Sequence, residues 1–376
     1  MTDLTGLDLT RKLISFNTIS PPGNEADCAR YIARLLENAG FDITWHDWQP
    51  QRPNLIATLP ATEEVTRGAI VYSGHLDTVP LGQVDWSEDP FAGQIKDGRM
   101  YGRGTSDMKS GVAACIMAGL ALAQEPVRRA EVKLIFSAGE ETGCEGVLAL
   151  AERPDLLGTC DALVVAEPTD NRPFIGHKGA LWLSLVHRGV TAHGSMPEKG
   201  KNAIFAACAS IDALRGFDFG VEVHAVMGGP SLNVGNMNAG LNVNSVPDLA
   251  RVGVDIRSTV GQSNAQIKEQ LGALLGEDVD IEPMTDMDHV YTDPDHPWMS
   301  QVFSVVEEVT GQRPEVGTAT YFTDASVLKP AMGDPATLIM GPGAMAMAHQ
   351  TDEYFETALM APCIEVFTRL GRLHIM

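Results

Sequence analysis

Apolar residues recur at helical spacing in several segments of the chain. This spacing predicts helices over residues 7–16 and 25–39, and the second ends at Gly40, a common helix stop. A third segment, 109–123, is apolar on almost every side, which indicates a helix that is buried all round. Four more segments show helical spacing: 202–217, 263–275, 298–311 and 357–372.

Short, continuously apolar runs predict strands that are buried on both faces, as in a parallel sheet. They are 53–59, AIVYS at 69–73, VKLIFS at 132–137, ALVVA at 162–166 and ATLIM at 336–340. The second, third and fourth runs lead within a few residues to His75, to Glu140 and Glu141, and to Glu167, and the fifth leads through GPG to His349. Because ligands in open α/β sheets bind at the carboxyl ends of strands, this recurrence predicts a functional site at one edge of the sheet.

The middle of the chain has a different pattern. After Gly176, strand-like runs near 181–188, 221–227, 231–236, 249–256 and 279–283 accompany two of the helices. This order predicts a four-stranded antiparallel sheet with two helices, inserted into an α/β domain. We therefore expect a catalytic domain with a mostly parallel sheet, residues 1–178 and 290–376, and an inserted α+β domain, residues 179–289. A chain of 376 residues has the length of about two domains.

Charge and cysteine usage restrict the partners and the compartment. The formal net charge of −22 repels phosphate, which argues against nucleic acid or an anionic membrane as a partner. The six cysteines are scattered without a CxxC pair, as in proteins of reducing compartments. The N-terminus lacks a secretory-signal profile, and no apolar run is long enough to span a bilayer. We expect a cytoplasmic protein that acts on a small molecule.

Five residues near these strand ends have side chains that bind metals. Imidazole and carboxylate suit a borderline ion such as Zn²⁺, and two neighbouring ions need a shared carboxylate between them. Asp107, at the start of the buried helix, is the candidate bridge. His75 and Glu167 would complete one ion, and Glu141 and His349 the other. The sequence thus predicts a two-metal hydrolase with room for a bridging water.

Two further acids stand beside these ligands. Asp77 lies two residues after His75, so in an extended chain its carboxylate could orient the imidazole. Glu140 precedes Glu141, and adjacent residues of an extended chain face opposite ways. Glu140 can therefore stand over the water as general base and return the proton to the leaving amine.

Motifs along the whole chain resemble one enzyme family. They are GHLDTVP, YGRGTSDMKSG, SAGEETG, VVAEPT, GVTAHGSMPEKGKNAI and GPGAMAMAHQTDEY. Together they resemble the M20 family of metallopeptidases and amidohydrolases, most of all its acetylornithine deacetylase and succinyl-diaminopimelate desuccinylase branch, with carboxypeptidase G2 as a relative. The resemblance implies two divalent metals per subunit, most often Zn²⁺ with Co²⁺ or Mn²⁺ as alternatives. It also implies a homodimer formed through the inserted lid domain, and the same ligands, base and orienting acid as above.

The resemblance also implies residues that contact substrate. His193 would bind the carbonyl oxygen of the substrate, in dimeric relatives at the partner subunit's site. The alternative is that His193 has only a structural role in a turn. Asn244 would help to bind substrate and Gly341 would lie in a loop lining the site. Arg257 would hold a carboxylate as a bidentate fork, or else form a surface ion pair.

One stretch departs from the family pattern. Relatives carry small residues before a Thr/Ser-Asp dipeptide, whereas here Tyr321 and Phe322 precede Thr323 and Asp324. Thr323 and Asp324 match the family's substrate-binding segment. The two aromatics would narrow the pocket or serve as packing residues.

These observations predict an amidohydrolase that cleaves an N-acyl amino acid, of deacetylase or desuccinylase type, with Glu140 as base of a metal-bridging hydroxide. A carboxypeptidase or dipeptidase with the same centre is the main alternative. An aromatic amide hydrolase, suggested by Tyr321 and Phe322, is a weaker one. A non-catalytic binding protein would have no need of Glu140 beside five ligands.

Overall fold

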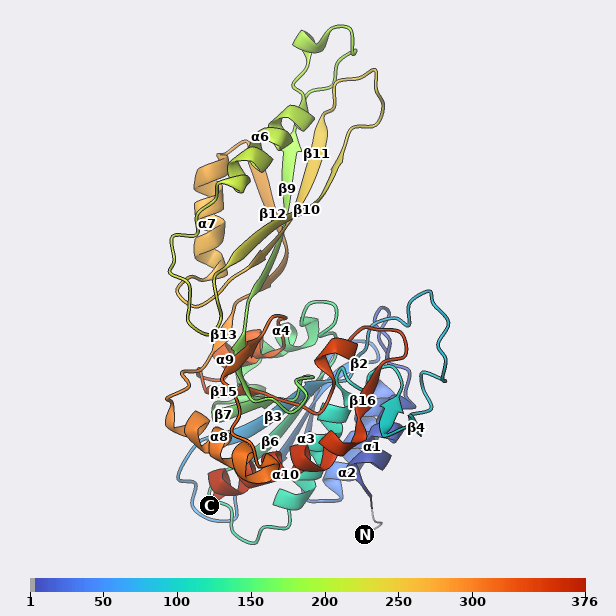
Figure 1. Ribbon diagram of the computed structural model, residues 1–376, viewed down its shortest axis with the longest axis vertical. Helices are drawn as coiled ribbons and strands as arrows, with labels where there is room; N and C mark the ends of the chain where they lie inside the picture. The colour runs from blue at the N-terminus through green and yellow to red at the C-terminus, as the bar shows by residue number, and fades with distance from the viewer. Residues whose placement is uncertain (1–3) are drawn as a thin grey trace. The chain divides into compact units, whose positions relative to one another are not determined.

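The computed structural model describes residues 4–376, which form two compact units (Figure 1). The larger unit contains the described residues up to Gly176, together with Val290–Ala319 and Thr323–Met376. The inserted unit contains His177–His289 and the short segment Thr320–Phe322. Within residues 4–376 no helix is both long enough and apolar enough to cross a membrane.

The larger unit is built on a nine-stranded sheet. Its centre consists of β3 (Ala69–His75), β6 (Val132–Ser137), β7 (Cys160–Val165) and β15 (Ala336–Ile339). Strand β3 pairs in parallel with both β6 and β7, and β7 pairs in parallel with β15. The carboxyl ends of these four strands therefore meet at one edge, and the prediction of a mostly parallel central sheet is confirmed. The other strands are β1 (Asp42–Gln49), β2 (Arg52–Leu59), β8 (Phe174–His177), β13 (Val290–Tyr291) and β14 (Gly317–Ala319).

Helices cover this sheet (Figure 1). Helix α3 (Lys109–Leu122) packs against β3, and it also contacts α1 (Gly6–Ile14) and α10 (Met360–Ile375). Most of its residues are buried, as its uniformly apolar sequence predicts. At Gly111 an added Cβ would lie 1.9 Å from the carbonyl oxygen of Ala166, so glycine lets the start of α3 lie against the end of β7. The remaining helices of the larger unit are α2 (Ala26–Glu37), α4 (Glu145–Ala151), α5 (Pro154–Leu157), α8 (Pro297–Thr310) and α9 (Ala325–Ala331), with the 3₁₀ turns η2 (Met345–Met347) and η3 (Thr357–Leu359).

A small second sheet lies in the larger unit. It consists of β4 (Gln94–Lys96), β5 (Arg99–Tyr101) and β16 (Tyr354–Glu356), and β16 pairs antiparallel with β5. This pairing joins the segment after His349 to the segment before Asp107, which are more than 240 residues apart in the chain.

The inserted unit contains a four-stranded antiparallel sheet with the order β10-β11-β9-β12. Its core lies between this sheet and two helices, and includes Leu183, Leu185, Val252 and Leu271. The strands are β9 (Ala180–Arg188), β10 (Ser231–Ala239), β11 (Leu249–Arg257) and β12 (Val279–Met287), and the helices are α6 (Ala203–Arg215), α7 (Asn264–Leu275) and the 3₁₀ turn η1 (Pro197–Lys199).

The strand expected near residues 221–227 was wrong. Gly220 and Gly228 adopt positive φ angles at its two ends, which turns the chain out of an extended path. The ring of His224 accepts hydrogen bonds from the backbone N–H groups of Val226 and Met227. The segment therefore folds into a local turn although its residues favour a strand.

Candidate metal centre

The parallel strands bring the candidate ligands to one edge of the sheet. His75 is the last residue of β3, and Glu167 follows β7 by two residues. Glu141 lies in the turn after β6, and His349 lies in the segment after β15. The shared direction of the four strands is thus the reason that residues so distant in sequence lie together.

Asp107 lies between two imidazoles. Its Oδ1 is 3.0 Å from His75 Nε2, and its Oδ2 is 3.4 Å from His349 Nε2. His349 Nε2 also lies 2.9 Å from Glu141 Oε2. His75, Asp107 and Glu141 each present a ligand atom within 4.8 Å of the other two. A carboxylate whose two oxygens face two separate imidazoles has the geometry that a bridging ligand requires.

His75 is oriented by the chain that follows it. Its Nδ1 lies 2.9 Å from the backbone oxygen of Asp77, which leaves Nε2 facing Asp107. The Asp77 carboxylate lies farther from Nδ1, at 3.6 Å. We expected that carboxylate to orient the imidazole, but the backbone oxygen of the same residue makes the closer contact.

The Asp77 carboxylate instead holds the turn that contains both glutamates. It accepts backbone N–H groups from Gly139 at 2.9 Å, from Glu140 at 3.2 Å and from Glu141 at 3.2 Å. Three successive donors outcompete a single imidazole for one buried carboxylate. Asp77 thus fixes the position of Glu140 and Glu141 relative to β3.

The same turn separates the two glutamates. We argued from an extended chain, but residues 139–141 form a turn in which Gly139 has a φ of 76°. Glu141 faces His349, whereas the carboxylate of Glu140 forms a second buried group with Cys144 and Asp324. Glu140 therefore lies beside the ligand cluster, and the described residues show no hydrogen bond between Glu140 and either imidazole.

Burial and mutual repulsion govern the acids of this site. Burial, followed by the charge of Asp107, raises the pKa of Glu167 and of Glu141. Burial also raises the pKa of Glu140 well above its usual value, against the opposing charge of His75 and with support from Glu167. The charges of these side chains interact strongly because the side chains are buried close together, where little water screens them.

The imidazoles respond in the opposite direction. Hydrogen bonds to Asp107 and then Glu141 raise the pKa of His349 to about 10. Burial opposes protonation of His75, but the bond to Asp107 and the charges of Glu167 and Glu140 outweigh it, so its pKa is raised. The site thus attracts positive charge strongly.

This donor set fits two divalent cations. Asp107 and Glu141 converge with His75 and His349, and Glu167 interacts electrostatically with this group. Glu141 Oε1 is buried without a hydrogen-bond partner among the described residues. Cations bound between these groups would relieve the repulsion and satisfy that oxygen. Imidazole and carboxylate are also the ligands that Zn²⁺ and its neighbours prefer.

Three predicted substrate residues of the larger unit are buried. Asp324 is 1% exposed and its Oδ2 lies 2.5 Å from Ser137 Oγ, and Thr323 is 0% exposed. Gly341 is buried against the backbone of Ala166 and Glu167 rather than placed on an open surface. Asp324 also lies close to Glu140, and Gly341 lies against the backbone of Glu167, so both border the candidate site within the protein interior.

The inserted unit carries the other predicted substrate residues. His193 is exposed, and its Nδ1 lies 2.7 Å from Ser195 Oγ. Asn244 is also exposed, and its backbone oxygen accepts the N–H of Gly194, so these two predicted residues belong to one local structure.

Arg257 is held within the inserted unit. Its Nε lies 3.0 Å from Asp255 Oδ1, and its guanidinium lies over the ring of Trp182. Phe322 contacts the same ring edge-on, with centroids 6.2 Å apart. This arrangement is the ion pair that we gave as the alternative for Arg257, and it shows Phe322 as a packing residue.

Sequence reasoning missed Glu353. Its side chain is fully buried and accepts hydrogen bonds from the loop that ends at Asp107. The signal was its place in the motif AHQTDEY, four residues after His349. A glutamate this near a metal ligand in a family motif indicates a role in the site.

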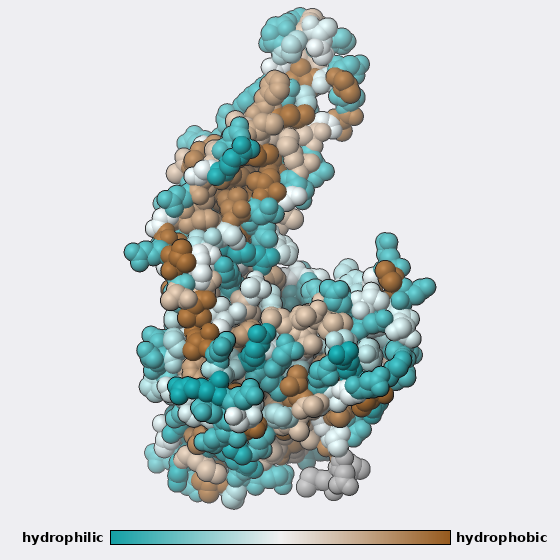
Figure 2. Space-filling model, viewed as in Figure 1, coloured by the Kyte–Doolittle hydropathy of each residue, from teal (hydrophilic) through white to brown (hydrophobic). Residues whose placement is uncertain are grey.

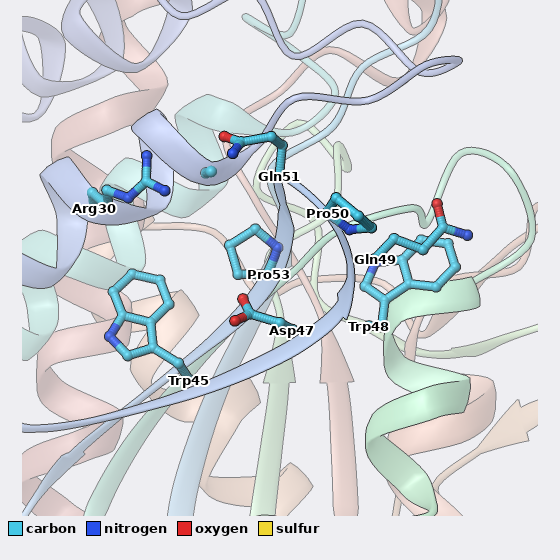
Figure 3. Close-up of a pocket in the computed structure, with 9 residues that line it drawn as sticks. Arg30, Trp45, Asp47, Trp48, Gln49, Pro50, Gln51 and Pro53 are labelled. Atoms are coloured by element: carbon cyan, nitrogen blue, oxygen red, sulfur yellow. The ribbon is translucent and has the colours of Figure 1, made fainter.

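A hollow of about 500 Å³ lies elsewhere on the larger unit, beside β1, β2 and α2 (Figure 3). Trp45, Trp48 and Arg30 are among the residues that line it. None of the candidate metal ligands lines it, so this hollow is separate from the metal centre.

Comparisons with known proteins place this site in a family. The model of peptidase family M20/M25/M40 matches residues 71–372, which contain every candidate ligand. The chain belongs to this family. It is a metal-dependent hydrolase that acts on amide bonds.

Relatives and solved structures agree with this assignment. An acetylornithine deacetylase of Proteus mirabilis is 29% identical over 390 residues, which cover 97% of this chain and 96% of the relative. A probable succinyl-diaminopimelate desuccinylase of Staphylococcus epidermidis is 27% identical over 408 residues and all of both chains. The resemblance to the acetylornithine deacetylase and succinyl-diaminopimelate desuccinylase branch is thereby confirmed.

The fold also matches solved structures. An M20 family metallo-carboxypeptidase of Sulfolobus solfataricus has a TM-score of 0.79 at 18% identity, over 100% of this chain and 99% of that one. A dinuclear metal binding peptidase of the M20 family from Bacillus subtilis has a TM-score of 0.72 at 16% identity, over 98% and 97%. At these identities the likeness shows the fold alone.

Proposed function

We propose that this protein is a two-metal amidohydrolase that removes the acyl group from a small N-acyl amino acid. The observation that carries the proposal is Asp107, whose two carboxylate oxygens face His75 and His349, with the buried Glu140 beside the cluster. A shared carboxylate next to an unligated buried acid is the arrangement that metal-assisted hydrolysis needs.

We assign the metal ligands as the sequence suggested. Asp107 would be shared, His75 and Glu167 would complete one site, and Glu141 and His349 the other. The ions, most often Zn²⁺ with Co²⁺ or Mn²⁺ as alternatives, would polarise the amide carbonyl and lower the pKa of an attacking water.

Glu140 acts as the general base in this proposal. Burial, with the charges of Glu167 and Asp324, raises its pKa, so this carboxylate accepts a proton more readily than an exposed glutamate does. It takes the proton from the attacking water and passes it to the leaving amine. Asp77 keeps Glu140 in place through the three N–H bonds to the turn.

The inserted unit supplies substrate contacts and the subunit interface. We propose that it serves as a lid, that His193 stabilises the oxyanion in its own or the partner subunit's site, and that Asn244 contacts substrate. Arg257 can bind a substrate carboxylate when it releases Asp255, its present partner. Thr323, Asp324 and Gly341 would shape the substrate site through the side chains that they support.

We also propose a homodimer formed through the inserted unit. Strand β10 lies at an edge of its sheet, so it has unpaired backbone groups on one side. On α6 the side chain of Phe205 is 74% exposed, and Figure 2 shows apolar surface over this part of the unit. Light scattering should give the mass of two chains, whereas the mass of one chain would contradict this assembly. The six free cysteines, five of them buried, favour a cytoplasmic location.

A carboxypeptidase or dipeptidase with the same centre is the second candidate. It is favoured by the family match, because the family is one of peptidases. Faster release of two amino acids from a dipeptide than of an acyl acid from an N-acyl amino acid would select it. An aromatic amide hydrolase, suggested by Tyr321 and Phe322 before Thr323, is a weaker alternative.

The test of the proposed function is a panel of N-acetyl, N-succinyl and N-formyl amino acids, dipeptides and aryl amides. We expect amine release from one N-acyl class, with loss on chelation and recovery with Zn²⁺. Dipeptides or aryl amides as the preferred substrates would replace the N-acyl assignment by the corresponding alternative.

A further inference from the structure

Glu353 makes an unusually complete set of hydrogen bonds. The side chain is 0% exposed and lies immediately before β16. Its Oε1 accepts the backbone N–H groups of Ser106 at 2.7 Å and Asp107 at 3.0 Å. Its Oε2 accepts the N–H of Gly104 at 3.1 Å and a guanidinium N–H of Arg103 at 2.6 Å. Each carboxylate oxygen therefore has two donors, and all four belong to residues 103–107.

A buried carboxylate with four donors is costly to form unless every donor is in place. The loop of residues 103–107 is therefore held in one conformation relative to Glu353. Two hydrogen bonds to backbone oxygens reinforce this conformation. The N–H of Gly102 donates to the backbone oxygen of Glu353 at 2.9 Å, and Ser106 Oγ donates to the backbone oxygen of Tyr354 at 2.6 Å. The loop ends at Asp107, whose carboxylate faces both imidazoles.

Glu353 also lies four residues after His349. The segment that carries His349 and the loop that carries Asp107 are thus joined through one side chain. Since Oε1 and Oε2 are both occupied by these donors, the carboxylate of Glu353 is not available as a ligand itself. Its contacts act on the positions of two other ligands.

We propose that Glu353 is a positioning residue that sets the geometry of the two-metal site by holding the Asp107 loop against the His349 segment. This inference rests on the proposed two-metal function. A shared carboxylate must satisfy two ions at once, so small shifts of Asp107 weaken both bonds together. Loss of the Glu353 contacts should therefore appear as weaker metal binding.

The test compares Glu353→Gln with Glu356→Gln. Glutamine has nearly the same shape, but its NH₂ group would face donors and cannot accept their hydrogen bonds. Glu356 lies three residues further along the chain, in β16, where its carboxylate is 2.8 Å from the guanidinium of Arg99 at a partly exposed site. The control thus removes a carboxylate from the same segment without touching the loop.

The measurement is a Zn²⁺ titration of metal-free protein against a competing chromophoric chelator, which needs no substrate. We expect two Zn²⁺ per wild-type chain, and a loss of affinity of about 10- to 100-fold for at least one ion in Glu353→Gln. Glu356→Gln should bind as the wild type does. Glu353→Asp, which retains the acceptors at a shorter reach, should have an intermediate affinity.

Chemical unfolding of the metal-free variants separates positioning from folding. A purely structural role would lower the free energy of unfolding and leave the affinities of the folded variant at wild-type values, and this result would overturn the proposal. If Glu353→Gln does not fold, wild-type affinities in folded Glu353→Asp would overturn it instead. A wild type that binds no Zn²⁺ would overturn the proposed function together with this inference. A wild type that binds two Zn²⁺ but has no amidase activity would overturn the proposed function alone, because the Zn²⁺ affinities are measured without substrate.

Discussion

Replacing Gly341 by alanine tests whether the backbone beneath Glu167 constrains the metal centre. Gly341 follows β15 and is tied to the neighbouring loop, because its N–H donates to Thr169 Oγ1 at 3.2 Å and its oxygen accepts the N–H of Asn171 at 2.9 Å. An added Cβ would lie 2.3 Å from the backbone oxygen of Ala166 and 2.6 Å from that of Glu167. Both are backbone atoms, so no flexible side chain can move aside.

The size of the effect follows from these distances. Ordinary contact with a Cβ begins at 3.4 Å, so the two segments must separate by about 1 Å. Overpacking of this kind costs about 1–3 kcal/mol of stability. A shift of about 1 Å at a catalytic group can reduce the rate by about 100-fold. We therefore expect Gly341→Ala to lose stability and to lose at least that factor in kcat/KM.

The assay combines denaturant unfolding with hydrolysis of the preferred substrate. The control is Gly272→Ala in α7, where an added Cβ meets nothing within 4 Å and alanine should stabilise the helix by about 0.5–1 kcal/mol. Wild-type stability and activity in Gly341→Ala would refute the reasoning, because the close approach to Ala166 and Glu167 would then impose no constraint.

Two further predictions concern the charged groups of the site. Glu140→Gln should lower kcat by about 10²- to 10⁴-fold while both metal ions remain bound, and parallel loss of metal would contradict the role of Glu140 as a base without a ligand function. The raised pKa of His349, about 10 in the metal-free protein, stabilises the fold below the ordinary histidine pKa of about 6.5 and ceases to do so as the pH rises toward 10. Unfolding of metal-free protein across this range should show a downward slope that is reduced in His349→Asn, and equal slopes in the two proteins would contradict it.

The sequence predicted the parts of the fold that are buried most completely. The parallel strands and α3 are continuous apolar runs, and burial on both sides is the one environment that favours such runs. Strand β1 was missed because its pattern, DITWHDWQ, is that of a half-exposed edge strand with few apolar residues in succession. The strand predicted at 221–227 is absent because the glycines at its ends and the ring of His224 turn the chain, and an apolar pattern does not reveal these contacts.

The site could be located from sequence more easily than its hydrogen bonds could be assigned. The ligand types follow from motifs at strand ends, but whether Asp77 uses its carboxylate or its backbone oxygen toward His75 depends on the turn that lies opposite. Arg257 and Asp255 lie two residues apart on one face of β11, so a strand pairs them locally before any substrate arrives. Glu353 gained its role from a loop about 250 residues away, which no local pattern reveals.

The most direct test of the central claim is the metal content of the purified enzyme, measured by elemental mass spectrometry together with its amidase activity. We expect two divalent ions per active chain, with activity that disappears as chelation removes them and returns as Zn²⁺ is restored. Full activity in protein freed of metal, or a folded wild-type chain that binds no divalent ion, would contradict the account.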